Sequence, residues 1–270
     1  MTLKENLRRL LPSVVRPRRI LAGPLRGGYL VTSWHDYPAA LLGYAESGLL
    51  AWFAKTVRPG ETWLDLGAHY GYTSMALCHH VGKTGRVFAF EPLLTTAGHL
   101  SSTREANRLS QLTVVPFALS SSEEITSARV QIRKAMAQPA AALSSRAWVE
   151  TIYCIALDKI WDRLCGPVDT ISGIKIDVEG MESEVLRGMI GILRKHRPRL
   201  VVEIHRSRGV ELETVAPILR EAGYDPGGCL LEPTSDADRS YEFAVDRDSS
   251  EAESARQWPE RLVKSTTSLA

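Results

Sequence analysis

Short apolar runs alternate with amphipathic stretches along the middle of the chain. We expect strands at residues 62–64, 86–90, 112–115, 171–178 and 200–204, each made mostly of apolar residues. Such runs are typical of strands that are buried on both faces of a parallel sheet. Helical periodicity in the intervening stretches predicts helices over residues 72–80, 96–109, 182–196 and 211–222. This alternation predicts an open, doubly wound α/β fold.

One stretch interrupts the alternation. Residues 128–160 contain two strand-like pieces around an Ala/Ser-rich loop at 135–145. We therefore expect a hairpin inserted before the fourth parallel strand. Asp158 stands where the next helix begins, and we expect it to be the N-cap residue of that helix.

The two ends of the chain differ in composition from the middle. We interpret residues 1–43 as an N-terminal extension with a basic helix and a strand or turn. Residues 44–245 form the expected main domain, which includes a last strand at 241–245. Residues 246–270 are polar, and we expect them to form a poorly ordered tail.

The basic N-terminal segment has apolar residues at helical spacing, among them Leu7, Leu10 and Val14. Such a helix can lie weakly on an anionic membrane surface or pack on its own domain. Because Pro12 and Pro17 break the pattern early, we favour the packed helix.

Composition excludes several classes of protein. The 270 residues carry a net charge of +2, which gives no electrostatic footprint for nucleic acid. No apolar run approaches the roughly 18 residues of a membrane span, and no apolar stretch of a secretory signal follows the basic start. The four cysteines have no C-x-x-C spacing, so we expect buried, reduced thiols in a cytoplasmic protein.

The first predicted strand ends in a glycine loop, D-L-G-A-H-Y-G-Y at positions 65–72. Gly67 and Gly71 let the backbone turn sharply and approach a ligand, and the helix that follows points its first amides at the loop. The D-x-G-x-x-x-G spacing differs from the motifs of dinucleotide and nucleoside-triphosphate sites. Asp65 at the strand tip would repel a phosphate and suit an ammonium group.

Glu91 ends the second predicted strand. A carboxylate at that tip can accept both hydroxyls of a ribose. The glycine loop and Glu91 together indicate an adenosine-type ligand, against the plainer alternative of an ordinary turn with a surface glutamate.

These motifs, with F-E-P, K-I-D-V-E-G-M-E and V-V-E-I-H, resemble the FkbM family of S-adenosylmethionine-dependent methyltransferases. The resemblance runs from about Tyr44 to Leu231, and K-I-D-V-E-G-M-E is its most specific part. It implies a Rossmann-like class I methyltransferase fold, with a mostly parallel seven-stranded sheet and helices on both faces. The cofactor contacts that it implies are Asp65, Gly67, His69, Gly71 and Glu91. His69 is a departure, since the family usually has Asn there.

The candidate catalytic residues follow the fourth and fifth predicted strands. Alternation places Lys175, Asp177 and, if the strand continues, Glu179 on one face. Asp177 and Glu179 are candidates to remove the proton of a hydroxyl acceptor during methyl transfer. Glu203 and His205 also share a face. His205 is either the base or a residue that orients a carboxylate, and Glu203 either orients His205 or pairs with Lys175.

Asp177, Glu179 and Glu203 also form a possible ligand set for Mg²⁺, which would make a sugar diol more acidic. Spacing alone does not separate a metal site from a metal-free acid/base site. We expect the site to contain no metal.

The leading functional hypothesis is an O-methyltransferase for a sugar, glycolipid or polyketide-type small molecule. The alternative is a non-catalytic subunit with the same fold that binds a partner protein. The D-V-E-G after the fourth strand is unlike the motif of nucleic-acid base methyltransferases, and the glycine spacing disfavours a dehydrogenase. Trp148 and the 135–145 loop are candidates for acceptor contacts, and residues 34–37 are others.

Overall fold

The computed structural model describes residues 11–133, 136–139, 149–164, 170–235 and 237–246. Its strands are β1 (Arg16–Arg19), β2 (Tyr29–Thr32), β3 (Thr62–Leu66), β4 (Arg86–Phe90), β5 (Leu112–Val115), β6 (Ala118–Leu119), β7 (Thr126–Arg133), β8 (Met136–Pro139), β9 (Val149–Ile155), β10 (Gly173–Ile176), β11 (Arg199–Ile204), β12 (Cys229–Pro233) and β13 (Arg239–Phe243). Its α-helices are α2 (Pro38–Leu42), α3 (Ser47–Thr56), α4 (Tyr72–Val81), α5 (Leu94–Ala106), α6 (Leu157–Leu164), α7 (Glu182–Arg187), α8 (Ile190–His196) and α9 (Leu212–Glu221), with a 3₁₀ turn η1 at Arg206–Arg208.

Seven of the described strands form the central sheet, in the order β12-β13-β11-β10-β3-β4-β5. The five strands from β11 to β5 run parallel, and β13 pairs antiparallel with β11. This mostly parallel sheet with helices on both faces confirms the predicted fold class. The register sets Lys175 beside Asp65, so the carboxyl ends of β3 and β10 meet at one edge.

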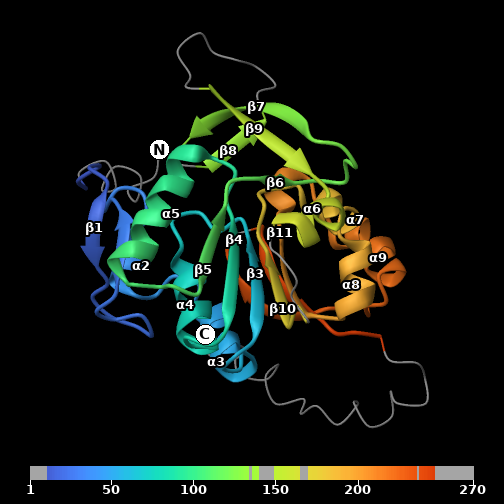
Figure 1. The fold of residues 1–270 in the computed structure, drawn as a ribbon, viewed down its shortest axis with the longest axis horizontal. Coiled ribbons are helices and arrows are strands. Elements are labelled where there is room, and N and C mark those ends of the chain that lie inside the picture. Colours follow the sequence, from blue (N-terminus) through green and yellow to red (C-terminus); the bar gives the residue numbers. More distant parts are fainter. Residues whose placement is uncertain (1–10, 134–135, 140–148, 165–169, 236, 247–270) are drawn as a thin grey trace, which may run out of the picture.

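Both faces of the central sheet are buried, as the apolar runs predicted. Leu64 and Leu66 of β3 pack with α6 to α9, whereas Trp63 packs with α3 and α4. Helices α4 and α5 lie on one side of the parallel strands and α6 to α9 on the other (Figure 1).

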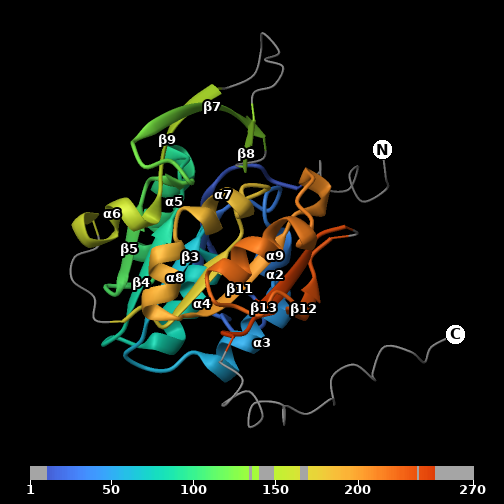
Figure 2. The same cartoon turned by 90° about the vertical axis from the view of Figure 1, so that its right-hand side faces the viewer.

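The predicted insertion is present and is larger than a hairpin. Strands β7 and β9 pair antiparallel, and β8 and β6 extend them to a four-stranded sheet in the described part of the chain. This second sheet lies across one end of the central sheet (Figures 1 and 2). Leu93, just after β4, packs on Val130 and Ile152 of the insertion. The insertion therefore stands at the carboxyl end of the parallel strands.

The N-terminal segment differs in part from its prediction. Arg16–Arg19 forms a strand paired antiparallel with β2, so the expected basic helix does not reach that far. Ile20 and Leu30 join the same apolar core as α3 and α4. No helix among the described residues is long and apolar enough to cross a membrane. Residues 1–10 and 247–270, to which the rest of the helix and the polar tail were assigned, lie outside the described residues.

Two helical predictions need correction. The single helix expected over 182–196 is divided into α7 and α8 at Gly188, where a Cβ atom would lie 1.8 Å from the carbonyl oxygen of Ser120. The backbone must pass too close there for a side chain. Asp158 caps α8 rather than its own helix, because its carboxylate accepts the N–H groups of Gly191 and Ile192 at 2.8 Å each.

The expectation of buried thiols holds for one described cysteine. Cys78 is buried, Cys154 is partly buried and Cys229 is exposed, and all three are free. Cys165 lies outside the described residues.

Candidate active site

The glycine loop after β3 has the close backbone approach that the sequence predicted. Gly67 has a φ of +82°, and a Cβ there would lie 1.7 Å from the carbonyl oxygen of Asp177. Gly71 has a φ of +91° and precedes α4, where a Cβ would meet Leu100 at 2.3 Å. Only glycine fits at either position. His69 also lies in the left-handed region, with a φ of +49°, which Asn adopts more readily than most residues.

Asp65 is fully buried beneath this loop. Its Oδ2 accepts hydroxyl hydrogen bonds from Thr73 at 2.8 Å and Ser74 at 2.6 Å, and its Oδ1 lies 3.3 Å from Nζ of Lys175. These contacts fix the junction between β3 and α4. The Asp65 carboxylate is thus taken up by Lys175 and the two hydroxyl groups, which hold the loop in place, and it is not turned toward the ammonium group of a ligand.

Glu91 lies at the tip of β4, beside the loop. Its Oε2 accepts the N–H of His69 at 2.9 Å, and its Oε1 accepts the N–H of Leu93 at 3.1 Å. Each carboxylate oxygen has a second lone pair, so both remain able to accept a ribose hydroxyl. Burial raises the pKa of Glu91 to about 7. The glycine cradle and this acceptor pair fit an adenosine-type ligand.

Lys175 joins the glycine loop to the acids that follow β10. Its Nζ donates to the carbonyl oxygen of Gly67 at 3.2 Å and to Oδ2 of Asp177 at 3.0 Å. Burial alone would lower the pKa of Lys175, but Asp177 and Asp65 outweigh burial and raise the pKa. Lys175 therefore pairs with Asp65 and Asp177, and the alternative pairing with Glu203 does not form.

His205, just after β11, lies at the centre of three carboxylates. Its Nδ1 lies 2.6 Å from Oε1 of Glu182. Because a carboxylate only accepts, Nδ1 carries a proton and Nε2 points to the other two acids. Nε2 lies 3.6 Å from Asp177 and 3.7 Å from Glu203. Burial would lower the pKa of His205, but the three carboxylates together outweigh burial and raise the pKa.

Glu203 is mostly buried, with 12% of its side chain exposed. Its Oε1 accepts the hydroxyl hydrogen of Thr234, which fixes the carboxylate next to His205. Burial and the nearby charge of Asp177 raise the pKa of Glu203. Asp177, Glu203 and His205 thus come together, and we call these three residues the acid–histidine cluster.

Glu179 is not in this cluster. Strand β10 ends at Ile176, three residues before Glu179, so the alternation that would align Glu179 with Asp177 does not continue that far. Glu179 has a φ of +54°, and its carboxylate lies 3.2 Å from the guanidinium of Arg208. The turn in the backbone carries this side chain to a partly exposed ion pair.

The sequence indicated no role for Glu182, although this residue ends the K-I-D-V-E-G-M-E motif. Its contact with His205 depends on how α7 folds back on β11, which spacing does not show. Residues 34–37 do reach the glycine loop: the Tyr37 ring lies 5.8 Å from the His69 ring and 5.9 Å from the Tyr72 ring. Trp148 and most of the 135–145 loop lie outside the described residues.

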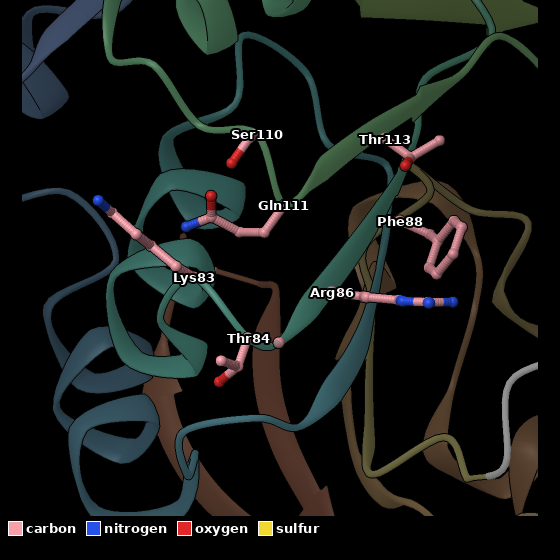
Figure 3. Close-up of a pocket in the computed structure, with 8 residues that line it drawn as sticks. Lys83, Thr84, Arg86, Phe88, Ser110, Gln111 and Thr113 are labelled. Carbon is pink, nitrogen blue, oxygen red and sulfur yellow. The ribbon is translucent and has the colours of Figure 1, made fainter.

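A pocket of about 510 Å³ lies away from these residues, near the amino ends of β4 and β5. Lys83 and Arg86 line it but point to opposite sides, so their charges do not converge (Figure 3). Ligands of parallel α/β sheets bind at the other end of the strands. The candidate site therefore remains at the carboxyl ends of β3, β4, β10 and β11.

Comparison with known proteins shows the family of the chain. The family model for the methyltransferase FkbM domain matches residues 65–226, from the glycine loop to the end of the α9 region. The comparison with curated proteins found no match.

Solved structures with a similar arrangement are distant. The methyltransferase FkbM from Methylobacillus flagellatus is 19% identical with a TM-score of 0.47, and the match covers 72% of this chain and 50% of that one. The chain thus spans half the length of that protein. A SAM-dependent O-methyltransferase from Thermotoga maritima is 13% identical with a TM-score of 0.48, over 81% and 74% of the two chains. Fibrillarin from Aeropyrum pernix is 15% identical with a TM-score of 0.45, over 86% and 82%.

The strand order, the glycine loop and the acid at the tip of β4 define an S-adenosylmethionine-dependent methyltransferase of class I fold. Because the family match covers more than half of the chain, the chain belongs to the methyltransferase FkbM domain family. S-Adenosylmethionine is therefore its cofactor.

Proposed function

We propose that the chain transfers a methyl group to a hydroxyl oxygen of a sugar, glycolipid or polyketide-type small molecule. The main support for this proposal is the pair of contacts made by Lys175. One ammonium group donates to the glycine loop, through Gly67, and to the acid–histidine cluster, through Asp177. The loop that fits the cofactor and the acids that fit the acceptor are thus fixed to each other.

The site residues divide into two groups in this proposal. Gly67, Gly71 and the Glu91 carboxylate hold the adenosine part of the cofactor, and Asp65 and the His69 backbone hold those groups in place. When bound, S-adenosylmethionine supplies a sulfonium methyl group, whose C–S electron pair stays on sulfur. The acceptor oxygen forms the new C–O bond, and its proton passes to the acid–histidine cluster.

A hydroxyl acceptor suits this cluster. A neutral hydroxyl group is a weak nucleophile, and its proton must leave as the oxygen attacks the methyl group. A base positioned beside the hydroxyl therefore raises the rate of methyl transfer. Asp177 and Glu203 are acceptors of protons, and Glu182 keeps the Nε2 edge of His205 turned toward them. The Glu179 carboxylate, which pairs with Arg208, has no part in this step.

The test is methyl transfer from ¹³C-methyl S-adenosylmethionine to a panel of hydroxylated sugars and polyketides, followed by NMR of the product. We expect a methyl carbon bonded to oxygen, and no such product with Asp177→Asn. A methyl group bonded to nitrogen or carbon would contradict the proposal. A folded protein that binds S-adenosylhomocysteine but methylates no acceptor would favour the non-catalytic partner-binding alternative.

A further inference from the structure

We propose that Asp177, Glu203 and His205 bind one divalent cation beside the methyl-transfer site. The sequence favoured a site without metal, and its alternative ligand set contained Glu179. The geometry replaces Glu179 with His205, whose side chain is only 6% exposed. One oxygen from each acid and one ring nitrogen all lie within 4.8 Å of one another.

His205 is a buried residue, and the hydrogen bond of its ring to a carboxylate is made by Nδ1, not by Nε2. The oxygens that Nε2 faces, at 3.6 Å on Asp177 and 3.7 Å on Glu203, are too far away for a hydrogen bond. Two ligands of one cation, each about 2.1 Å from it, stand about 3.0 Å apart at 90° and about 3.4 Å apart at 110°. The observed spacing is thus close to that of atoms that share an ion.

Glu182 prepares the histidine for this role. Its carboxylate lies 2.6 Å from Nδ1, so the neutral ring that binds a cation keeps its proton on Nδ1 and directs the Nε2 lone pair into the cluster. A carboxylate on the far nitrogen is the usual second contact of a metal-binding histidine. Glu182 is itself fully buried, and the N–H of Gly180 donates to the same Oε1 at 3.0 Å.

Charge balance supports the same inference. Among the residues that the structure describes, the carboxylates of Asp65, Asp177, Glu182 and Glu203 form ion pairs with two basic groups, Lys175 and His205. With all four carboxylates ionised, two negative charges stay uncompensated even when His205 is protonated, and a divalent cation supplies the balance. Lys175 takes Oδ2 of Asp177 and leaves Oδ1 directed to His205.

The donor set indicates the kind of cation. Two carboxylates favour Mg²⁺ or Mn²⁺, whereas an imidazole favours first-row transition metals, so Mn²⁺ satisfies all three ligands. A cation here would bind the acceptor oxygen and lower the pKa of its hydroxyl, and the carboxylate oxygen of Glu203 that is not a ligand would accept the proton. That role rests on the proposed function, whereas binding of the cation does not.

The experiment titrates the purified full chain with Mn²⁺ alone, by calorimetry and electron paramagnetic resonance, without cofactor or acceptor. We expect one Mn²⁺ per chain in the wild type and at least tenfold weaker binding in Glu203→Gln and His205→Asn. His80→Asn on α4 is the matched control, since it removes a partly buried histidine outside the site. Its affinity for Mn²⁺ should equal that of the wild type. Binding of S-adenosylhomocysteine by each variant shows that it is folded.

Absence of stoichiometric binding in the folded wild type would overturn the inference. Equal binding by wild type and both cluster variants would overturn it as well, because the ion would then lie elsewhere. Hydroxyl methylation that is unchanged by EDTA would contradict the role of the cation in methyl transfer and would leave the proposed function intact. Mn²⁺ bound at the cluster without any hydroxyl methylation would contradict the proposed function alone.

Discussion

Oε1 of Glu182 lies 2.6 Å from Nδ1 of His205, across the gap between the start of α7 and the end of β11. This contact decides which nitrogen of His205 faces Asp177 and Glu203. It makes Glu182 a positioning residue of the acid–histidine cluster.

Glu182→Gln is expected to lower kcat by about tenfold or more, because a neutral amide holds the imidazole in place less firmly. The KM for the acceptor and the affinity for S-adenosylhomocysteine should stay near the wild-type values. Steady-state kinetics with calorimetry measure all three. Glu182→Asp keeps the charge and should recover part of kcat; a loss confined to KM would contradict the positioning role.

Asp177→Asn and Glu179→Gln should differ in turnover, although the two residues belong to one motif. Asp177 belongs to the cluster, so its variant should lose most turnover while its cofactor affinity stays near wild type. Glu179 pairs with Arg208 at the surface, so Glu179→Gln should keep turnover within about twofold, as expected for a partly exposed ion pair. Initial rates at saturating cofactor test both; wild-type turnover in Asp177→Asn would remove Asp177 from the catalytic residues.

Asp65→Asn should lower both stability and cofactor affinity. The substitution removes a buried charge that Lys175 and two hydroxyl groups contact, at a cost of about 3 kcal/mol in the free energy of unfolding. Urea denaturation measures that change. The control is Glu184→Gln, which breaks an exposed pair with Arg187 and should cost no more than about 1 kcal/mol. Equal stability of the two variants would argue against the role of Asp65.

Affinity for S-adenosylhomocysteine should rise with pH through about 7 and level off near pH 8. The pKa of Glu91 is about 7 in the unliganded protein because of burial, and the ionised carboxylate is the better acceptor for two ribose hydroxyls. At pH 6 about a tenth of Glu91 is ionised, so the affinity should be about tenfold below its plateau.

Calorimetry at pH 6, 7 and 8 measures this dependence on pH. Glu91→Gln should bind more weakly at pH 8 and show little change between the three values. A wild-type affinity that does not vary from pH 6 to pH 8 would place the ribose elsewhere.

Much of the fold follows from local pattern. The apolar runs at 86–90 and 112–115 are strands with the same bounds in the structure, because most of their residues are apolar and are buried or partly buried. The Gly67–Gly71 loop was equally visible, since glycine spacing records where the backbone must turn. The strand predicted at 171–178 is longer than the observed strand, Gly173–Ile176. The alternation of apolar and charged residues continues past Ile176, where the backbone turns.

The contacts between distant segments could not be predicted. Glu232 of β12 accepts the N–H groups of Gly48 and Leu49 at 2.8 Å each and so caps α3. No periodicity connects residues so far apart. The same limit hid the contact between Glu182 and His205, and it allowed Glu179 to be grouped with Asp177 on the assumption that the strand continued.

Cofactor binding is the central claim, and titration of the full chain with S-adenosylhomocysteine, beside NAD as a control, tests it most directly. We predict micromolar binding of S-adenosylhomocysteine and none of NAD, with the affinity reduced in Glu91→Gln. A folded protein that binds neither compound, or NAD alone, would contradict the account.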